Sequence, residues 1–181
     1  MKRAIGVAAA IATAACLAGT AMAEVVDVSQ TGFLTRSQVV FHATPAAVYA
    51  ALVRVGAWWD PEHTYSGDGR NLTLEARPGG CFCEKLPGGG GVQHMTVVYA
   101  SPGQSLRLVG GLGPLQQSGV AASLTWTLTK TEGGTQVEMK YSVGGYFQGG
   151  FEPIAPAVDG VLDGQLQRLK RFVETGSPGT K

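Results

Sequence analysis

A strict alternation of apolar and polar side chains between residues 124 and 143 is the feature that most constrains the fold. Within residues 135–143, Val, Met, Tyr and Val alternate with Gln, Glu, Lys and Ser. A period of two is typical of a strand with one buried face. Residues 124–128 alternate in the same way, and residues 131–134 supply a Gly-containing turn between the two segments. The sequence therefore predicts an antiparallel hairpin with one apolar face.

Weaker strand patterns surround this hairpin. Glycine accounts for 27 of the 181 residues, and much of it occurs as doublets between strand-like segments. Because glycine adopts the positive φ angles that tight turns require, these doublets indicate turns rather than disorder. We expect an antiparallel meander whose other strands cover residues 33–41, 71–76, 81–86, 92–99 and 106–109.

Two helices are predicted around the strands. Thr44-Pro45 supplies an N-cap hydroxyl and a proline at the first helical position, so a short helix runs through Leu52. Residues 156–174 carry apolar side chains three and four apart and end before Gly176. A sheet with one apolar face must cover that face, and this long amphipathic helix is the available cover. The fold class is therefore α+β.

Short motifs along the chain occur in the order of a known superfamily. They are residues 43–49 at the start of the first helix, Trp58-Trp59-Asp60, Pro78-Gly79-Gly80, Val97, Pro102, Leu106, Gly133-Gly134-Thr135 and residues 166–172 in the last helix. In these motifs the chain resembles the helix-grip START and Bet v 1-like (SRPBCC) superfamily, near the polyketide cyclases and Hsp90 ATPase activator-like proteins. The resemblance implies a curved antiparallel sheet wrapped around the C-terminal helix, with two short helices after the first strand. It also implies a mostly apolar tunnel for a lipid, polyketide, sterol or aromatic compound.

The N-terminal segment has the order of a secretory signal, with a positive head, an apolar run over residues 4–18 and a small-x-small exit at Ala23. The run is shorter than the roughly 20 apolar residues of a membrane-spanning helix, so a retained anchor is not expected. Cys16 is a rival lipidation site, but Thr13 stands where bacterial lipoprotein signals carry a large aliphatic residue. We expect cleavage after Ala23 and a periplasmic or secreted protein of an exported subgroup.

Removal of residues 1–23 leaves enough chain for one domain over residues 24–176, followed by a disordered tail over 177–181. The full chain has 14 basic and 13 acidic residues, and loss of Lys2 and Arg3 changes the net charge from +1 to −1. The remaining Lys and Arg residues form no basic block, so nucleic acid is not an expected partner. A small hydrophobic molecule fits the composition better, and no cofactor is expected.

An aromatic and polar cluster follows the first helix. Trp58, Trp59, His63 and Tyr65 lie within eight residues, and together they offer apolar surface and a few polar groups to orient a ligand. The competing interpretation is a Trp that caps the core and a solvated loop. Further along the chain, Trp126 and Tyr141 point to the apolar face of the hairpin and are either core or tunnel lining. The full set of expected ligand-binding residues is Trp58, Trp59, His63, Tyr65, Cys83, His94, Trp126 and Tyr141.

Cys81 and Cys83 form a second cluster and share one face of a predicted strand. Extended residues two apart place their Cα atoms at about 6.5–7 Å, the upper limit for a disulfide, so a bridge is disfavoured unless the strand bends. Free thiols in an oxidising compartment call for an explanation, although buried free cysteines are common as small apolar residues.

His94 lies on the next predicted strand, and its role depends on the register. In one register His94 shares the face of Cys81 and Cys83, which gives two thiolates and an imidazole for zinc or copper, with His63 as a fourth group. A shift of one residue places His94 with Glu84 instead, as a carboxylate–imidazole pair for acid–base chemistry. The spacing matches no familiar zinc pattern, so a metal is not favoured.

Three functions follow from these clusters. The leading hypothesis is an exported protein that binds a small hydrophobic ligand without transforming it. The second is a cyclase- or dehydratase-like enzyme with His63, Tyr65, Glu84 and His94 as acid–base groups. The third is a metal-handling protein that uses Cys81, Cys83 and His94. The Gly88–Gly91 run lacks the Gly-Lys-Ser/Thr of a phosphate-binding loop, and no Gly-x-Ser-x-Gly or dinucleotide motif is present.

Overall fold

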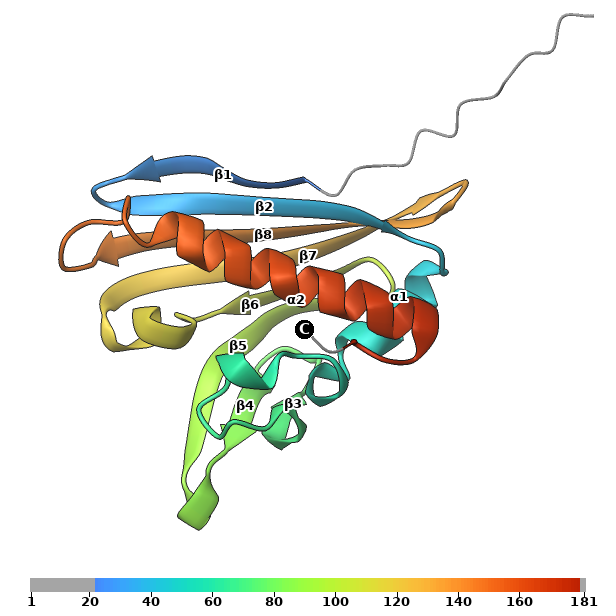
Figure 1. Ribbon diagram of the computed structural model, residues 1–181, viewed down its shortest axis with the longest axis horizontal. Helices are drawn as coiled ribbons and strands as arrows, with labels where there is room; N and C mark the ends of the chain where they lie inside the picture. The colour runs from blue at the N-terminus through green and yellow to red at the C-terminus, as the bar shows by residue number, and fades with distance from the viewer. Residues whose placement is uncertain (1–21, 180–181) are drawn as a thin grey trace, which may run out of the picture.

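The computed structural model describes residues 22–179, and its main feature is one eight-stranded antiparallel sheet (Figure 1). The strands follow the order β1-β2-β8-β7-β6-β5-β4-β3 across the sheet. Their bounds are β1 Met22–Ser29, β2 Gly32–Phe41, β3 Leu72–Leu74, β4 Cys81–Lys85, β5 Gly91–Ser101, β6 Ser105–Val109, β7 Gly119–Thr131 and β8 Gly134–Tyr146. All five predicted weaker strands and the predicted hairpin are present, and from β3 to β8 the sheet is a meander.

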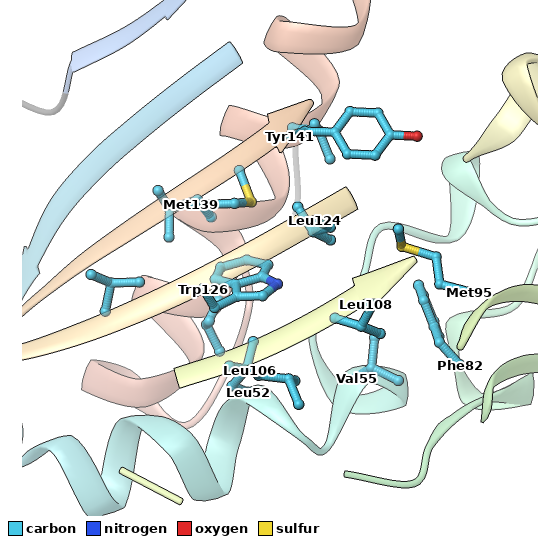
Figure 2. Packing of buried hydrophobic residues seen from close by; sticks show 14 of the residues in the cluster. Leu52, Val55, Phe82, Met95, Leu106, Leu108, Leu124, Trp126, Met139 and Tyr141 are labelled. Carbon is cyan, nitrogen blue, oxygen red and sulfur yellow. The ribbon is translucent and has the colours of Figure 1, made fainter. Parts of the chain in front are cut away.

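The β7–β8 hairpin forms the centre of the sheet, as its alternation predicts. Trp126 pairs with Met139 and Leu124 with Tyr141, and all four side chains are buried on the inner face. Figure 2 shows these side chains beside Leu106 and Leu108 of β6 and Leu52 at the end of the first helix, α1 (Pro45–Leu52). The apolar face of the hairpin thus forms the sheet side of the hydrophobic core.

Strand β1 is a correction to the sequence analysis, which expected no strand before residue 33. It pairs antiparallel with β2, with a register shift between Val25 and Asp27. Val26 and Val28 are exposed, because this strand lies at the sheet edge and follows no clean alternation. Its pairing is set by the backbone of β2 rather than by an apolar face of its own. Of the predicted signal, residues 1–21 with Cys16 lie outside the described residues.

The two predicted helices are confirmed. Helix α1 covers Pro45–Leu52, and the Thr44 hydroxyl accepts a hydrogen bond from the Ala47 N–H at 3.3 Å. Helix α2 covers Ala155–Thr175 and ends at Gly176, whose φ of 79° is left-handed. Leu162, Leu166 and Leu169 of α2 are buried, and the helix lies across the sheet in Figure 1.

Short 3-10 segments complete the chain. They are η1 Val55–Ala57, η2 Pro61–His63, η3 Gly69–Asn71, η4 Pro87–Gly89 and η5 Gly113–Gln117. Helix α1 and segments η1 to η3 follow β2, so the predicted short helices after that strand are present. The fold is α+β and matches the helix grip, with a curved sheet around a C-terminal helix. In residues 22–179 no helix has the length and apolar character to cross a membrane.

Candidate functional site

A cavity of about 470 Å³ lies between the first turns of α2 and the inner face of β4 and β5. The first half of α2 and the residue before it contribute aliphatic side chains, and the loops after α1 and β6 close the other sides. The lining residues are Trp59, Glu62, His63, Thr64, Tyr65, Phe82, His94, Leu112, Gly113, Pro114, Gln117, Ile154, Ala157, Val158, Val161 and Leu162. Most of this wall is apolar, with a few polar groups gathered on the loop and β5 side.

The loop that carries Trp59, His63 and Tyr65 is attached to α2 by two hydrogen bonds. The buried Asp60 N–H donates to Gln165 Oε1 at 2.9 Å, and Arg168 Nε donates to the Trp58 carbonyl at 2.9 Å. Within the loop, Trp59 Nε1 donates to the His63 carbonyl at 3.0 Å. These bonds place one side of the cavity wall relative to the helix that forms the other.

A β-bulge brings His94 to the cavity. Phe82 pairs with Met95, but Cys83 pairs with Gln93, so His94 is an extra residue on β5. The bulge breaks the alternation, and His94 and Met95 are both buried although they are adjacent in the chain. Neither register weighed from the sequence included this extra residue. The outcome agrees with the alternative in which His94 joins Glu84.

Glu84 and His94 form a buried carboxylate–imidazole pair. His94 Nε2 lies 2.9 Å from Glu84 Oε2, and the two residues are 6% and 2% exposed. Glu84 also accepts hydrogen bonds from the Tyr65 N–H at 3.1 Å and the Ser66 N–H at 2.5 Å. The His94 ring makes tilted contacts with the rings of Phe82 and Tyr65, whose centroids lie 5.0 and 5.9 Å away. The pair therefore also holds the loop at the mouth of the cavity.

The surroundings fix the protonation of this pair. Burial by itself raises the pKa of the Glu84 carboxyl, but hydrogen bonds from Ser66, Tyr65 and His94 outweigh it, so the pKa lies below its ordinary value. Burial lowers the pKa of the His94 imidazole, and the nearby Glu84 carboxylate offsets this only in part. At neutral pH a carboxylate thus faces a neutral imidazole, and Nε2–H donates to it.

The other imidazole nitrogen is available to a ligand. Within residues 22–179 no hydrogen bond reaches Nδ1 of His94, and Nδ1 is not among the enclosed side-chain atoms that lack a partner. His94 lines the cavity, and its Nδ1 carries a lone pair that no protein group within residues 22–179 occupies. Such an atom can accept a hydrogen bond or a proton from a bound molecule.

The cysteines are a second correction. The structure pairs Cys81 and Cys83 in a disulfide with a Cα–Cα distance of 5.4 Å, shorter than a regular strand would give. The extended geometry assumed from the sequence fails here because the β4–β5 ladder shifts between Phe82 and Cys83. Cys83 is not among the lining residues, since its side chain points to the opposite face from Phe82 and Glu84.

The metal-handling interpretation loses its ligands in this arrangement. Disulfide sulfurs are not thiolates, and His94 lies on the other face of the sheet from both cysteines. Among the residues that the structure describes, no group of three or more His, Cys, Asp and Glu side chains is placed to hold a metal ion.

The remaining candidates divide between wall and core. Trp59, His63, Tyr65 and His94 line the cavity, but Trp58, Trp126 and Tyr141 are buried behind it. The Trp58 indole donates to the Ala51 carbonyl at 3.0 Å, and its ring meets Trp126 edge-on at 6.3 Å. Burial raises the pKa of Tyr141 to about 12, and its hydroxyl accepts from the Leu112 N–H at 2.9 Å. Tyr141 thus supports a lining residue without itself lining the cavity.

Sequence reasoning missed part of the lining. The α2 side chains that line the cavity belong to the apolar face that its periodicity predicts to be buried. That pattern does not distinguish residues packed in the core from residues that line a cavity. The segment with Leu112, Gly113 and Pro114 has no periodicity at all. Its 3-10 turn carries a proline at its start, and the Leu112 N–H before it donates to the Tyr141 hydroxyl of a distant strand.

The family of the chain follows from a sequence comparison. Residues 33–174 match the model of a family described as polyketide cyclase/dehydrase and lipid transport. The chain belongs to this family. The match spans β2 to α2, the elements that form the cavity, and it confirms the resemblance drawn from the motifs. No curated protein is similar enough in sequence to be matched to the chain.

Solved structures confirm the fold. MLL2253 from Mesorhizobium loti has a TM-score of 0.57 and 15% identity over 78% of this chain and 96% of its own. CalU16 from Micromonospora echinospora has a TM-score of 0.56 and 13% identity over 87% of this chain and 88% of its own. The Aha1 dimer from Colwellia psychrerythraea has a TM-score of 0.57 and 18% identity over 78% of this chain and 96% of its own. At these identities the likeness concerns the fold alone.

Proposed function

We propose that this protein is an exported binding protein that holds a small, largely apolar molecule in the cavity between α2 and the β4–β5 wall. The cavity of about 470 Å³ carries this proposal, since its size is that of a small-molecule site. Aliphatic and aromatic side chains provide the favourable burial, and a few polar groups on one side orient the ligand. A lipid, a polyketide-like compound or an aromatic compound has the required chemistry.

The predicted signal supports a location outside the cytoplasm. Activation of an ATPase and cyclisation of a carrier-tethered polyketide are the best-known functions of the superfamily. Both need a partner found in the cytoplasm, so neither suits an exported protein. Binding and carriage of a free ligand need no such partner. The family description includes lipid transport, which agrees with this role.

Native mass spectrometry of the mature protein, purified from its own periplasm, tests the proposal. We expect a bound small molecule in stoichiometric amount. Val158→Trp places an indole into the cavity and should abolish the bound mass, whereas Gln167→Trp changes α2 at a position that does not line the cavity and should retain it. An empty wild-type protein, or equal ligand content in both variants, would contradict the proposal.

One observation favours a second candidate function, an acid–base enzyme of the cyclase or dehydratase type. His94 in the cavity wall is hydrogen-bonded to the buried Glu84 behind it, and the Tyr65 ring lies 5.9 Å from the imidazole in a tilted contact. A neutral imidazole backed by a carboxylate is a suitable general base. His94→Phe keeps the ring packing and removes the base, so conversion of the co-purified ligand should stop while its binding persists. Equal conversion by wild type and His94→Phe would eliminate this candidate.

A further inference from the structure

Strand β4 connects the disulfide to the cavity across a single residue. Cys81 and Cys83 lie on one face, and Phe82 and Glu84 lie buried on the other. Phe82 lines the cavity and its ring lies 5.0 Å from the His94 ring in a tilted contact, and Glu84 is hydrogen-bonded to His94 Nε2. A change in the backbone between Cys81 and Cys83 therefore moves the two residues that hold the imidazole.

The disulfide and the bulge occupy the same place in the ladder. Between the pairs Cys81–Thr96 and Cys83–Gln93, β4 advances two residues while β5 advances three. The disulfide holds the two β4 Cα atoms 5.4 Å apart, compared with about 6.5–7 Å in a regular strand. A shortened β4 paired with a β5 that carries one extra residue makes the two strands bend at this point. Without the bulge, strand alternation would place His94 and Met95 on opposite faces.

We propose that Cys81–Cys83 is a reversible thiol–disulfide site whose oxidised state selects the bulged register and so places His94 against Glu84 in the cavity wall. Both cysteines are partly exposed, so an external thiolate can reach the bond. The co-reactant is a dithiol, either small or carried by a partner protein. The coupling to the Glu84–His94 pair stands on its own, and only its effect on ligand affinity rests on the proposed binding function.

The exchange balances with that co-reactant. One thiolate of the dithiol attacks a sulfur of the Cys81–Cys83 bond, which breaks and releases the other cysteine as a thiolate. The second thiolate of the reagent then attacks the reagent's own sulfur in the mixed disulfide, which breaks the bond to the protein, releases the second cysteine as a thiolate and leaves the reagent as its cyclic or intramolecular disulfide. Two electrons and two protons have then passed to the protein, whose cysteines are both thiols. β4 is free to extend.

Linkage gives this coupling a measurable consequence. If the oxidised register binds an apolar ligand about fivefold more tightly, then the ligand makes the disulfide about fivefold harder to reduce, because coupling between two equilibria is reciprocal. For a two-electron couple this factor corresponds to about 20 mV.

The test follows the imidazole signals by two-dimensional NMR in dithiothreitol redox buffers at fixed pH. The chain has three histidines and three cysteines, and Cys16 is in the predicted signal, so in the mature protein dithiothreitol acts on this one pair. The fraction reduced is measured by alkylation and mass spectrometry. We expect the His94 signals to change with the same midpoint as the cysteines, while those of the exposed His42 remain constant.

Two further measurements complete the test. Cys81→Ser with Cys83→Ser should give the reduced His94 signals without any reductant. N-phenyl-1-naphthylamine, a neutral apolar fluorophore, should bind the reduced protein about fivefold more weakly. Unchanged His94 signals at full reduction would overturn the proposal, and so would loss of all native signals, since the claimed effect is local. If the fluorophore binds neither state, the binding function fails and the NMR result alone decides the coupling.

Discussion

Replacement of Gln165 by Leu tests how the cavity loop is held. Gln165 is 1% exposed on α2, and its Oε1 accepts the hydrogen bond of the Asp60 N–H at 2.9 Å. Leu fills a similar volume but leaves a buried N–H without a partner, which costs about 1–3 kcal/mol. For a domain of this length 1 kcal/mol lowers the Tm by about 2–4 °C, so a loss of about 2 kcal/mol lowers it by about 4–8 °C. The effect should be concentrated in the loop that carries Trp59, His63 and Tyr65.

Urea unfolding and hydrogen exchange measure the two parts of this prediction. Gln167→Leu is the matched control, because Gln167 lies on the same helix, is partly exposed and, within residues 22–179, its side chain makes one hydrogen bond, to Asp163 at 3.4 Å. Its free energy of unfolding should stay within about 0.5 kcal/mol of wild type. Faster exchange in Gln165→Leu should be confined to residues 58–66. Equal stability of the two variants would refute the assignment of the Gln165–Asp60 bond as the link between loop and helix.

Two more predictions concern the residues around His94. The folded protein resists protonation of His94, so the free energy of unfolding should fall as the pH drops below about 6.5, and further below the ordinary Glu pKa as Glu84 loses its hydrogen-bonded carboxylate. Urea unfolding at pH 7 and pH 5 should show a smaller loss for His94→Phe than for wild type, and equal losses would contradict the lowered His94 pKa. Gly110→Ala should destabilise the protein by about 1–3 kcal/mol, since φ is +143° there and a Cβ would lie 2.6 Å from the His94 carbonyl oxygen. Gly133→Ala, with no atom within 4 Å of the added Cβ, is its control, and similar melting temperatures would argue against close packing at Gly110.

The parts of the fold predicted from the sequence are those that repeat a local pattern. The β7–β8 hairpin and α2 each bury one face along many residues, so periodicity alone identifies them. Strand β1 lacks such a face and exists because β2 offers unpaired backbone groups. No pattern within residues 22–29 carries that information.

The site was predictable only as a set of candidates. His63, Tyr65, Glu84 and His94 were identified by their chemistry, and the structure brings the last three into contact. The choice between a cysteine and a carboxylate partner for His94 depended on the register, which a single inserted residue decides. The sequence could not show whether Trp126 and Tyr141 are core or cavity-lining residues, because residues of both kinds lie on the same apolar face of the sheet.

The bulge at His94 is a local exception that the rest of the fold does not require. Pairing of Phe82 with Met95 and of Glu84 with Val92 would be continuous if β5 lacked one residue, and His94 would then not be buried beside Met95. Instead the chain buries a carboxylate and an imidazole in an apolar wall, which costs free energy unless each is hydrogen-bonded. The hydrogen bonds from Tyr65, Ser66 and His94 to Glu84 offset this cost, yet they leave Nδ1 of His94 unused. A pair that served stability alone would gain from a protein partner for that nitrogen, so its free lone pair agrees with the proposed binding function, in which a bound molecule supplies the missing hydrogen bond.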